Sequence, residues 1–580
     1  MTSLNRYAAC FIAGLLSGVS TIFFVMPIRN VSLLVIGFVI LLLTLWYHRF
    51  FLSIKDLRHL PKWKQRLVLI FSLIFSLLFL LSIKGEQTYL SDNSLLTVAC
   101  VYIGTYFTIN CFVLWVVLAF LRVEVKSAPE FMNKPNGWKP LVYALPHLAV
   151  WALYLIAFFP GVMSRDSVDQ WAQTETGMFN DWHPIMYTLF IMLLRHIWDS
   201  PAAVALAQIV IMALIFGYCM TQFEKAGIRK SVTWAITLLL AISPVNGIYS
   251  ITLWKDVLYS AFLFLFCTVI FNLVVTDGEW LQRKQNMALF FLSAFGLVFF
   301  RHNGFPVFIV MGISLLFVFR HQFKRIAFLC GLTAILYYTV TGPVFDYLKV
   351  TPSDPNEKLS IPTQQLARVI ALNGNITKEQ AEYLNQILPL PLWKQYYRPY
   401  TTDHIKFSKE YNRQAIFPDH VSTYLRTWRD ICLQNPKLAA EALIQQTSLV
   451  WQINPPNHNY HSLTYMTIIF HNSFGIKRTV VSQPLTLAID KYLSVSNDTF
   501  RLIFWRPATY TFLMILFTFI AFLRNDWKAW LVPLAVLLNT AVVFIALPAQ
   551  DFRYLYANSI VCFMTFLFAF ISYRKKVTLP

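Results

Sequence analysis

The sequence predicts an all-α protein that crosses a membrane many times, and three observations carry this prediction. First, 57% of the 580 residues are hydrophobic and only 13% are charged, which is unlike a soluble domain. Second, apolar runs of roughly 17 to 25 residues, long enough to cross the hydrocarbon as helices, recur along almost the whole chain. Third, Lys and Arg lie mainly in short loops between these runs. The net charge of +20 therefore indicates membrane orientation, and nucleic-acid binding is not expected.

About fourteen apolar stretches qualify as membrane-spanning helices. They are 7–26, 31–48, 67–83, 95–121, 141–159, 201–220, 233–251, 257–275, 287–300, 305–320, 326–345, 503–523, 528–547 and 556–573. The first has no convincing cleavage site and is followed at once by the second, so we expect it to be retained. A shorter run, 185–197, is interrupted by Arg195 and His196 and predicts a helix lying along the interface.

Loop charge predicts the orientation of the chain. With both termini in the cytoplasm, five basic segments fall on the cytoplasmic side: 49–66, 122–139, 225–230, 321–325 and 574–576. The outer face then receives the loop 160–200, the segment 346–502 and the short motifs WKD (254–256), RHNG (301–304) and AQDFRY (549–554). Nearly all residues with candidate chemistry are therefore expected on the outer face.

This topology divides the chain into four parts. Residues 1–140 hold the first helices and cytoplasmic loops, and 141–345 hold a second membrane module that carries the outer loop 160–200. Residues 346–502 contain prolines and only short apolar runs, which predicts a small, mostly helical extracytoplasmic domain before the last three helices in 503–580.

Several common functional classes lose their support at the sequence level. Seven of the eight cysteines lie in apolar runs and no CxxC pair is present, so neither a disulfide framework nor a cysteine metal site is expected. His458, His461 and His471 lack metal-ligand spacing. No GxSxG, Walker or dinucleotide motif occurs, which argues against a lipase, an ATPase or a redox enzyme.

The outer loop contains the first candidate catalytic residues. Asp166 follows an apolar helix and a Pro-Gly turn, and Asp169 lies one helical turn further along. Asp166 has two interpretations. It is part of a helix start capped through Ser164 or Ser167, or it is a general base whose pKa is raised by partial desolvation at the membrane rim.

Candidate substrate-binding residues flank the other spans. RHNG occurs where one span ends and the next begins, and a guanidinium there matches phosphate oxygens while Asn303 and Gly304 allow close approach of the backbone. For several positions a structural interpretation stays open, such as helix entry at His183, a local Lys255–Asp256 ion pair, or an Asp551–Arg553 pair that locks a helix end. The residues expected to bind substrate are Arg165, His183, Lys255, Arg301, His302, Asn303, Gln550 and Arg553.

These motifs together resemble a known superfamily. An apolar helix followed by FFPGVMSRDSVDQW, then DWHP and a short interfacial helix, resembles the catalytic module of the GT-C integral-membrane glycosyltransferases. The pattern PGxxSxDSxxQ, WHP, KD and RHNG is similar to a bacterial branch of that superfamily. The resemblance covers about 141–345, and it departs from many members because Arg165 and Ser167, and no second acid, flank Asp166.

The resemblance implies a function. Such enzymes transfer a sugar from a polyprenyl-phosphate carrier to a lipid, glycan or protein of the cell envelope, usually with inversion, at the outer face of the bacterial cytoplasmic membrane. Asp166 would then be the general base, and Arg301, with His302 or Lys255, would bind the carrier phosphate. His183 and Asp169 would orient the substrates. The resemblance implies no firm cofactor and leaves a divalent metal open.

Two other classes remain as alternatives. A polysaccharide polymerase or ligase would use a lipid-linked oligosaccharide in place of a single lipid-linked sugar. A transporter or flippase would place ionisable residues at mid-span and often shows repeated halves, neither of which is evident here. A scaffold without activity would leave the polar clusters around Asp166 and Arg301 unexplained.

Overall fold

The computed structural model describes residues 3–25, 31–84, 94–123, 125, 137–455 and 462–573. These residues form helices joined by loops and isolated β-bridges, without a β-strand. Within them, ten helices are long and apolar enough to cross a membrane, or eleven if the bent pair α10 and α11 is one span. The predicted class of a polytopic helical protein is therefore confirmed.

Each of the fourteen predicted stretches contains a helix. In ten of these stretches the helix is long enough to cross a membrane, and four differ. One is bent, since α10 (Lys230–Ile242) turns by 58° into α11 (Pro244–Ser250). The other three are short apolar helices, namely α13 (Lys284–Phe299), α14 (Gly304–Val318) and 552–568. The run predicted to lie at the interface forms α8 (Ile185–Ile197). Several residues considered in the sequence analysis lie outside the described residues, namely Lys126, Lys134, His458, His461, Arg574, Lys575 and Lys576.

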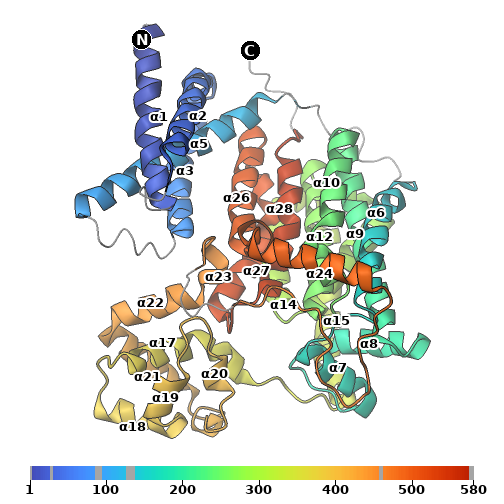
Figure 1. The fold of residues 1–580 in the computed structure, drawn as a ribbon. Coiled ribbons are helices and arrows are strands. Elements are labelled where there is room, and N and C mark those ends of the chain that lie inside the picture. The colour runs from blue at the N-terminus through green and yellow to red at the C-terminus, as the bar shows by residue number, and fades with distance from the viewer. Residues whose placement is uncertain are drawn as a thin grey trace.

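The N-terminal helices form a bundle beside the rest of the chain (Figure 1). It consists of α1 (Ser3–Val25), α2 (Leu33–Ser53), η2 (Ile54–His59), α3 (Lys62–Ile83) and α5 (Leu95–Arg122). Its contact with the main body is made by ring stacking of Phe71 on Phe519, with centroids 3.7 Å apart, and by a hydrogen bond from Lys64 Nζ to the Leu523 carbonyl. Many apolar side chains of α2 stay exposed, as expected of a helix that faces lipid.

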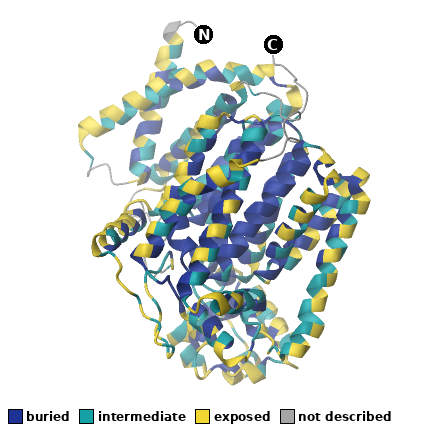
Figure 2. Ribbon diagram, turned by 90° about the vertical axis from the view of Figure 1, so that its right-hand side faces the viewer, coloured by how far each residue is buried: buried dark blue, intermediate teal, exposed yellow. Residues whose placement is uncertain are grey.

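The main body is built around α12 (Lys255–Val275), whose residues from Asp256 onward are all buried. Figure 2 shows this buried centre in dark blue. The helices packed around or beside it are α6 (Lys139–Ala157), α9 (Pro201–Lys225), α10, α11, α13, α14, α15 (Phe323–Thr339), α26 (Pro507–Arg524), α27 (Leu531–Ala546) and α28 (Tyr556–Phe568). A helix that is apolar all round and fully enclosed by others is a core element, so α12 carries its N-terminal residues to a fixed place.

The segment after α15 forms a separate small domain. A π-helical turn (Val340–Val344) and α16 (Phe345–Leu348) lead into it, and its apolar core includes Leu366, Trp393 and Tyr424. Its helices are α17 (Ser360–Ala371), α18 (Lys378–Ile387), α19 (Leu390–Tyr396), α20 (Asp403–Lys406), α21 (Val421–Gln434), α22 (Pro436–Gln446) and α23 (Ser448–Trp451). We call residues 346–451 the outer domain.

Residues 462–502 pack on the main body and not in the outer domain. The backbone of Phe470 donates to the Met163 carbonyl (2.8 Å), and that of Thr479 donates to the Phe159 carbonyl (2.8 Å). The helix α24 (Gln483–Asp498) follows and lies across the bundle in Figure 1. The segment expected as one domain therefore divides into the outer domain and a strap formed by 462–502.

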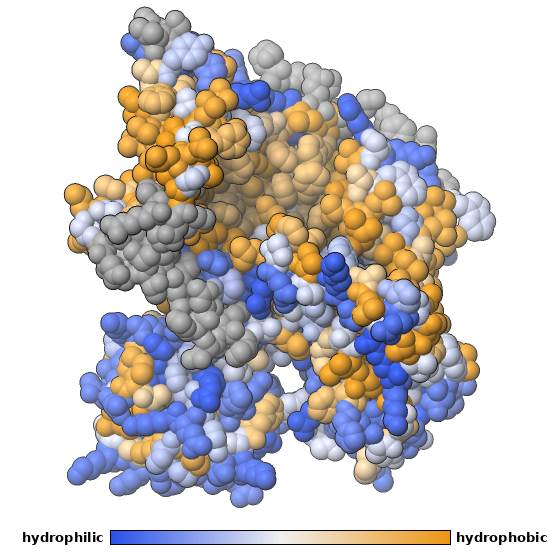
Figure 3. Space-filling view, in the orientation of Figure 1, coloured by the Kyte–Doolittle hydropathy of each residue, from blue (hydrophilic) through white to orange (hydrophobic). Residues whose placement is uncertain are grey.

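The predicted outer elements gather at one end of the bundle. Figure 1 shows the outer domain, α7 (Arg165–Thr176) and α8 at the same end. Figure 3 shows apolar surface over the helices and a largely polar surface over the outer domain. At other helix ends, Arg524 donates to the Phe120 carbonyl (2.7 Å) and Lys528 pairs with Asp277 (2.6 Å).

Candidate functional site

The candidate site begins at a tight turn after α6. Gly161 has a φ of 130°, and a Cβ there would lie 3.2 Å from the Ile251 carbonyl oxygen, so glycine suits this position on both counts. Val162 pairs with the segment 251–253, since its N–H donates to the Ile251 carbonyl and its own carbonyl accepts from the Leu253 N–H. The turn therefore fixes the start of the outer loop against the segment that leads into Lys255.

The helix α7 begins with a side-chain cap. The Ser164 hydroxyl accepts from the Ser167 N–H, and the Ser167 hydroxyl accepts from the Ser164 N–H, which forms a reciprocal capping box. The Ser164 hydroxyl also accepts a hydrogen bond from the Trp254 indole (2.7 Å), and the Ser167 hydroxyl donates to the Leu253 carbonyl (2.8 Å). Ser164 is thus the capping residue, and Asp166 is left in the first turn with its carboxylate available for other contacts.

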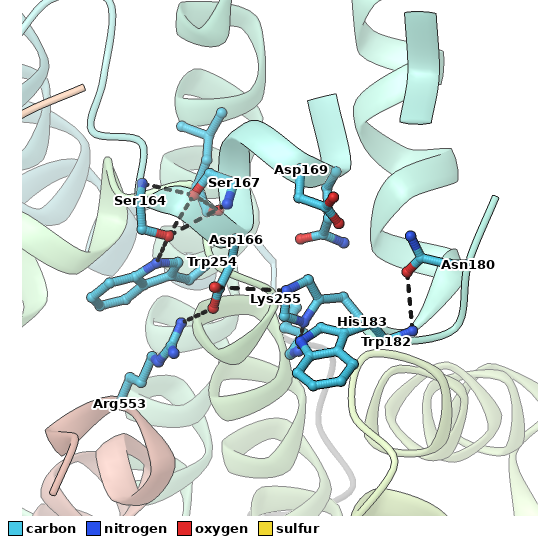
Figure 4. A network of polar contacts seen from close by, with 12 residues as sticks. Ser164, Asp166, Ser167, Asp169, Asn180, Trp182, His183, Trp254, Lys255 and Arg553 are labelled. Atoms are coloured by element: carbon cyan, nitrogen blue, oxygen red, sulfur yellow. Dashed lines mark hydrogen bonds and ion pairs between the residues drawn. The ribbon is translucent and has the colours of Figure 1, made fainter. Parts of the chain in front are cut away.

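Asp166 lies at the centre of a polar network from three distant parts of the chain (Figure 4). One carboxylate oxygen accepts from Arg553 Nη1 at 2.7 Å, and the other lies 3.8 Å from His183 Nε2. His183 Nδ1 in turn is hydrogen-bonded to the Lys255 ammonium. The network therefore joins the outer loop, the start of α12 and the entry to α28.

The protonation states follow from this network. Burial alone raises the pKa of Asp166, but the positive charges of Arg553 and Lys255 outweigh it and hold that pKa well below its ordinary value. Our expectation of a raised pKa at Asp166 was therefore wrong, because it did not include the guanidinium of Arg553. Burial and the Lys255 charge lower the pKa of His183 well below its usual range, so its imidazole is neutral at pH 7.

A second ion pair lies at the first turn of α12. Asp256 is almost fully buried, and its carboxylate is 3.2 Å from Arg301 Nη1. The same Arg301 nitrogen donates to the Tyr554 carbonyl at 3.0 Å, and the guanidinium lies over the rings of Tyr259 and Tyr554. Asp256 thus pairs with the arginine of RHNG, and Lys255 makes its hydrogen bond to His183.

The AQDFRY motif completes this group. Arg553 Nε is 2.7 Å from the Asp551 carboxylate, and its guanidinium lies 4.8 Å from the Trp254 ring centroid. The predicted Asp551–Arg553 pair is therefore present. Burial raises the pKa of Asp551 to about 6, against the opposing effect of Arg553. We call Asp166, Asp256, Arg301, Asp551 and Arg553 the arginine cluster.

A further acid lies in the loop 179–183, which we call the DWHP loop. The Asp181 carboxylate is 3.9 Å from His302 Nε2, and the same imidazole nitrogen is 3.1 Å from the Asp181 carbonyl oxygen. Burial raises the pKa of Asp181 to about 6, although the Lys255 charge lowers it. His302 of RHNG thus contacts the DWHP loop, while its neighbour Arg301 belongs to the arginine cluster.

The remaining predicted residues lie outside these contacts. Arg165 is exposed, and Asp169 is exposed on the next turn of α7, where it accepts a hydrogen bond from Gln173 (2.9 Å). Asn303 immediately precedes α14. Gln550 is buried and donates to the Gln446 carbonyl at 2.6 Å, which ties the outer domain to the entry of α28.

Three acids of the site received no role from the sequence. The sequence predicts only local pairs for Asp256, with Lys255, and for Asp551, with Arg553, and Asp181 occurs only as the first residue of the DWHP motif. A usable signal was present, because each lies within two residues of a predicted binding residue on the outer face. The partners were not readable, since Arg553 and Asp166 are 387 residues apart.

Metal binding receives no further support from side-chain clustering. Among the residues that the structure describes, no group of three or more His, Cys, Asp or Glu side chains could hold a metal ion.

Comparison with known proteins identifies a family. The model of a family of unknown function, DUF6020, matches residues 170–578, which includes His183, Lys255, Arg301 and Arg553. No curated protein and no solved structure matches the chain.

Proposed function

The chain belongs to the DUF6020 family, and we propose that it is a GT-C-like membrane glycosyltransferase that uses a polyprenyl-phosphate sugar at the outer face. One observation carries the proposal. Four motifs that are far apart in the sequence, around Asp166, Lys255, Arg301 and Arg553, meet in one polar network at an end of an apolar helix bundle. A donor anchored in the bilayer by its lipid chain presents its phosphate and sugar at this level.

The cations of the network suit a phosphate group to different degrees. Arg553 contacts two carboxylates and Arg301 contacts one, so both charges are largely compensated. Lys255 instead holds the neutral His183, which leaves an ammonium charge that a phosphate oxygen can share. We assign the carrier phosphate to Lys255 first, with Arg301 as the next cation.

The reaction follows from this placement. A hydroxyl oxygen of a cell-envelope acceptor attacks the anomeric carbon, the bond from that carbon to the phosphate oxygen breaks, and its electron pair leaves with the polyprenyl phosphate. Lys255 and Arg301 stabilise the negative charge that develops on the leaving group. The acceptor proton passes to a carboxylate, and attack from the face opposite the phosphate inverts the anomeric carbon.

Asp166 enters the proposal as the acid that organises the network. Its lowered pKa keeps it ionised at neutral pH, where it holds Arg553 and faces His183. Loss of its charge would free Arg553 and move His183, and Lys255 would move with it. Catalysis by positioned groups is sensitive to displacements of about 1 Å, so we expect turnover to depend on Asp166.

The location of the charges favours an enzyme over a transporter. The candidate groups lie in loops and first helical turns, at 166, 183, 255, 301 and 553, and not along the middle of a span. A polymerase or ligase remains the runner-up, because it would bind the same lipid phosphate. The two differ in the donor, which carries one sugar for a transferase and an oligosaccharide for a polymerase.

The test is release of polyprenyl phosphate by the full chain in nanodiscs. A panel of polyprenyl-phosphate sugars is incubated with a membrane extract as acceptor, for the wild type, Asp166→Asn and Asp419→Asn. Asp419 is an exposed acid of the outer domain, so its variant is a matched control. We expect release with at least one donor, a loss of at least about 100-fold in Asp166→Asn, and no change in Asp419→Asn.

Two results would contradict the proposal. Absence of release with every monosaccharide donor, together with release from lipid-linked oligosaccharides, would favour the polymerase. Equal rates for wild type and Asp166→Asn would show that the network is not part of the site.

A further inference from the structure

Asp181 is held more firmly by its backbone than by its side chain. Its N–H donates to the carbonyl of Thr351, which lies near the start of the outer domain, at 2.8 Å. Its carbonyl oxygen lies 3.1 Å from His302 Nε2, and the neighbouring Asn180 forms a parallel bridge with Thr351. The backbone of Asp181 is thus fixed between RHNG and the outer domain.

Among the described residues, no guanidinium pairs with this carboxylate. Its side chain is 20% exposed and lies 3.9 Å from His302 Nε2, and burial lowers the pKa of that imidazole to about 4, so His302 is neutral at pH 7. Asp166, by comparison, accepts a 2.7 Å hydrogen bond from Arg553. A carboxylate oxygen that is partly desolvated and has no strong donor on it can take a proton from a substrate hydroxyl, whereas one held by Arg553 cannot do so without breaking that pair.

An aromatic pair, Trp182 and Phe407, begins at the residue that follows Asp181. Trp182 lies next to it, and its ring centroid is 6.1 Å from that of Phe407, which follows α20 of the outer domain. Phe407 is 52% exposed. Aromatic faces carry partial negative charge that suits the C–H groups of a sugar, so this pair offers a saccharide ring a surface next to Asp181 in the chain.

We propose that Asp181 is the general base, taking the proton of an acceptor sugar hydroxyl that is bound against Trp182 and Phe407. This inference rests on the proposed function and assigns its acceptor side. As the acceptor oxygen bonds to the anomeric carbon, its proton moves to an Asp181 carboxylate oxygen, and the bond to the carrier phosphate breaks with its electrons on the phosphate. The protonated Asp181 then releases the proton to solvent through its exposed edge.

The surroundings of Asp181 define its pH response. Lys255 from α12 lies close enough to lower its pKa, and Tyr337 from α15 interacts with it electrostatically. His302 of RHNG faces the Asp181 carboxylate, and the charge of Lys358 in the outer domain helps to lower the pKa of His302. With a pKa of about 6, Asp181 is mostly ionised at pH 7 and is still a stronger base than an ordinary aspartate.

The test is the pH dependence of polyprenyl-phosphate release in nanodiscs, with the donor that the wild type uses best. We compare the wild type with Asp181→Asn, Asp181→Glu and Asp419→Asn. Asp181→Asn should lose 100- to 10,000-fold in kcat, as general-base removal does, with the KM for donor unchanged. The wild type and Asp419→Asn should lose activity below about pH 6, and Asp181→Glu should recover part of the rate.

A second measurement reports the carboxyl group without turnover. Infrared difference spectra of wild type and Asp181→Asn in nanodiscs, recorded from pH 4 to 8, isolate the protonated carboxyl band of Asp181. We expect that band to disappear near pH 6. Phe407→Ala should raise the KM for acceptor while leaving that for donor unchanged.

The outcomes separate this inference from the proposed function. If the wild type is active and Asp181→Asn retains full kcat and the same acidic limb, Asp181 is not the base, while the transferase proposal stands. If the wild type releases no polyprenyl phosphate from any donor, the proposed function fails and the role of Asp181 fails with it. A drop in kcat with a raised KM for donor and no change in the acidic limb would also overturn the inference, since it indicates a structural role.

Discussion

The arginine cluster and the DWHP loop lie in the same network but treat their acids in opposite ways. In the arginine cluster, Asp166 accepts from Arg553 at 2.7 Å and its pKa is lowered. In the DWHP loop, the Asp181 carboxylate lies 3.9 Å from the His302 imidazole, and burial raises its pKa to about 6. Both are aspartates in one outer loop, so the difference arises from the guanidinium and not from the sequence around them.

This comparison shows how two roles can be assigned to similar acids. Groups whose environments move their pKa values apart are suited to different steps. An ionised Asp166 fixes Arg553 and faces His183, while a more basic Asp181 stands at the edge of the outer domain, where we propose that the acceptor binds. The predictions below test whether this division is real.

Removing Arg553 should have the largest effect. Arg553→Gln leaves Asp166 and Asp551 without their guanidinium, and breaking a buried pair by deleting one partner destabilises a protein by about 3 to 5 kcal/mol. Arg553 is largely buried and contacts both acids at 2.7 Å. We expect a matching fall in the unfolding temperature in nanodiscs and loss of turnover.

The control for this prediction is Arg426→Gln, an exposed arginine of the outer domain, which should stay within about 0.5 kcal/mol of the wild type. The double variant Arg553→Gln with Asp551→Asn should recover part of the lost stability, because one unpaired charge is removed. An unchanged unfolding temperature in Arg553→Gln would mean that the arginine cluster does not hold the site together.

Replacing the two aspartates should change stability in opposite directions at neutral pH. The lowered pKa of Asp166 contributes stability above its unfolded pKa of about 4, and this is lost as pH falls through the lower folded value. The raised pKa of Asp181 means that the folded state binds its proton more tightly, so stability falls as pH rises from about 4 to about 6. Asp166→Asn should therefore destabilise at pH 7.5, whereas Asp181→Asn should stabilise by up to about 3 kcal/mol.

The measurement is thermal unfolding of each variant in nanodiscs at pH 7.5 and pH 4.5. At pH 4.5 the gain in Asp181→Asn should largely disappear, because the wild-type carboxyl is then mostly protonated in the folded state. A destabilised Asp181→Asn at pH 7.5 would indicate an ion-paired Asp181 and remove the contrast between the two regions.

The part of this structure that the sequence predicts is the part set by local composition. Long apolar runs exclude a soluble fold, and each predicted span contains a helix because a backbone in lipid must satisfy its own hydrogen bonds. The helix start at Ser164 is local too, since its partner Ser167 is three residues away. These features need no knowledge of the rest of the chain.

The site was predictable only as a set of residues. Asp166, His183, Lys255, Arg301 and Arg553 were expected on one face, and the structure brings them together. Their pairing was not predictable, because the partner of each is set by how distant helices pack. Gln550 illustrates the same limit, since its amide is used to hold Gln446 of the outer domain.

Substitution of Lys255 tests whether donor binding is separate from the acceptor position proposed at Asp181. Lys255→Met removes the ammonium assigned to the carrier phosphate, and Lys255→Arg keeps a positive charge there. We expect the KM for donor to rise about 10-fold in Lys255→Met, equivalent to about 1.4 kcal/mol, and less in Lys255→Arg. Initial rates over a range of donor concentrations measure this. A rise in the KM for acceptor alone would place Lys255 on the side of the DWHP loop.

The smallest expected effect tests the helix start that carries Asp166. Ser164→Ala removes the cap of α7 and the acceptor of the Trp254 indole, and we expect a loss of about 1 kcal/mol, as for other N-caps. Ser482→Ala is a matched control, because Ser482 precedes α24 without a side-chain capping bond. Thermal unfolding in nanodiscs should separate the two variants. Equal effects of the two substitutions would mean that the cap does not position Asp166, which would then be held by the tight turn at Gly161 and by the contact with Arg553. A larger loss in Ser164→Ala would show that the capped first turn of α7 sets the geometry on which the arginine cluster depends.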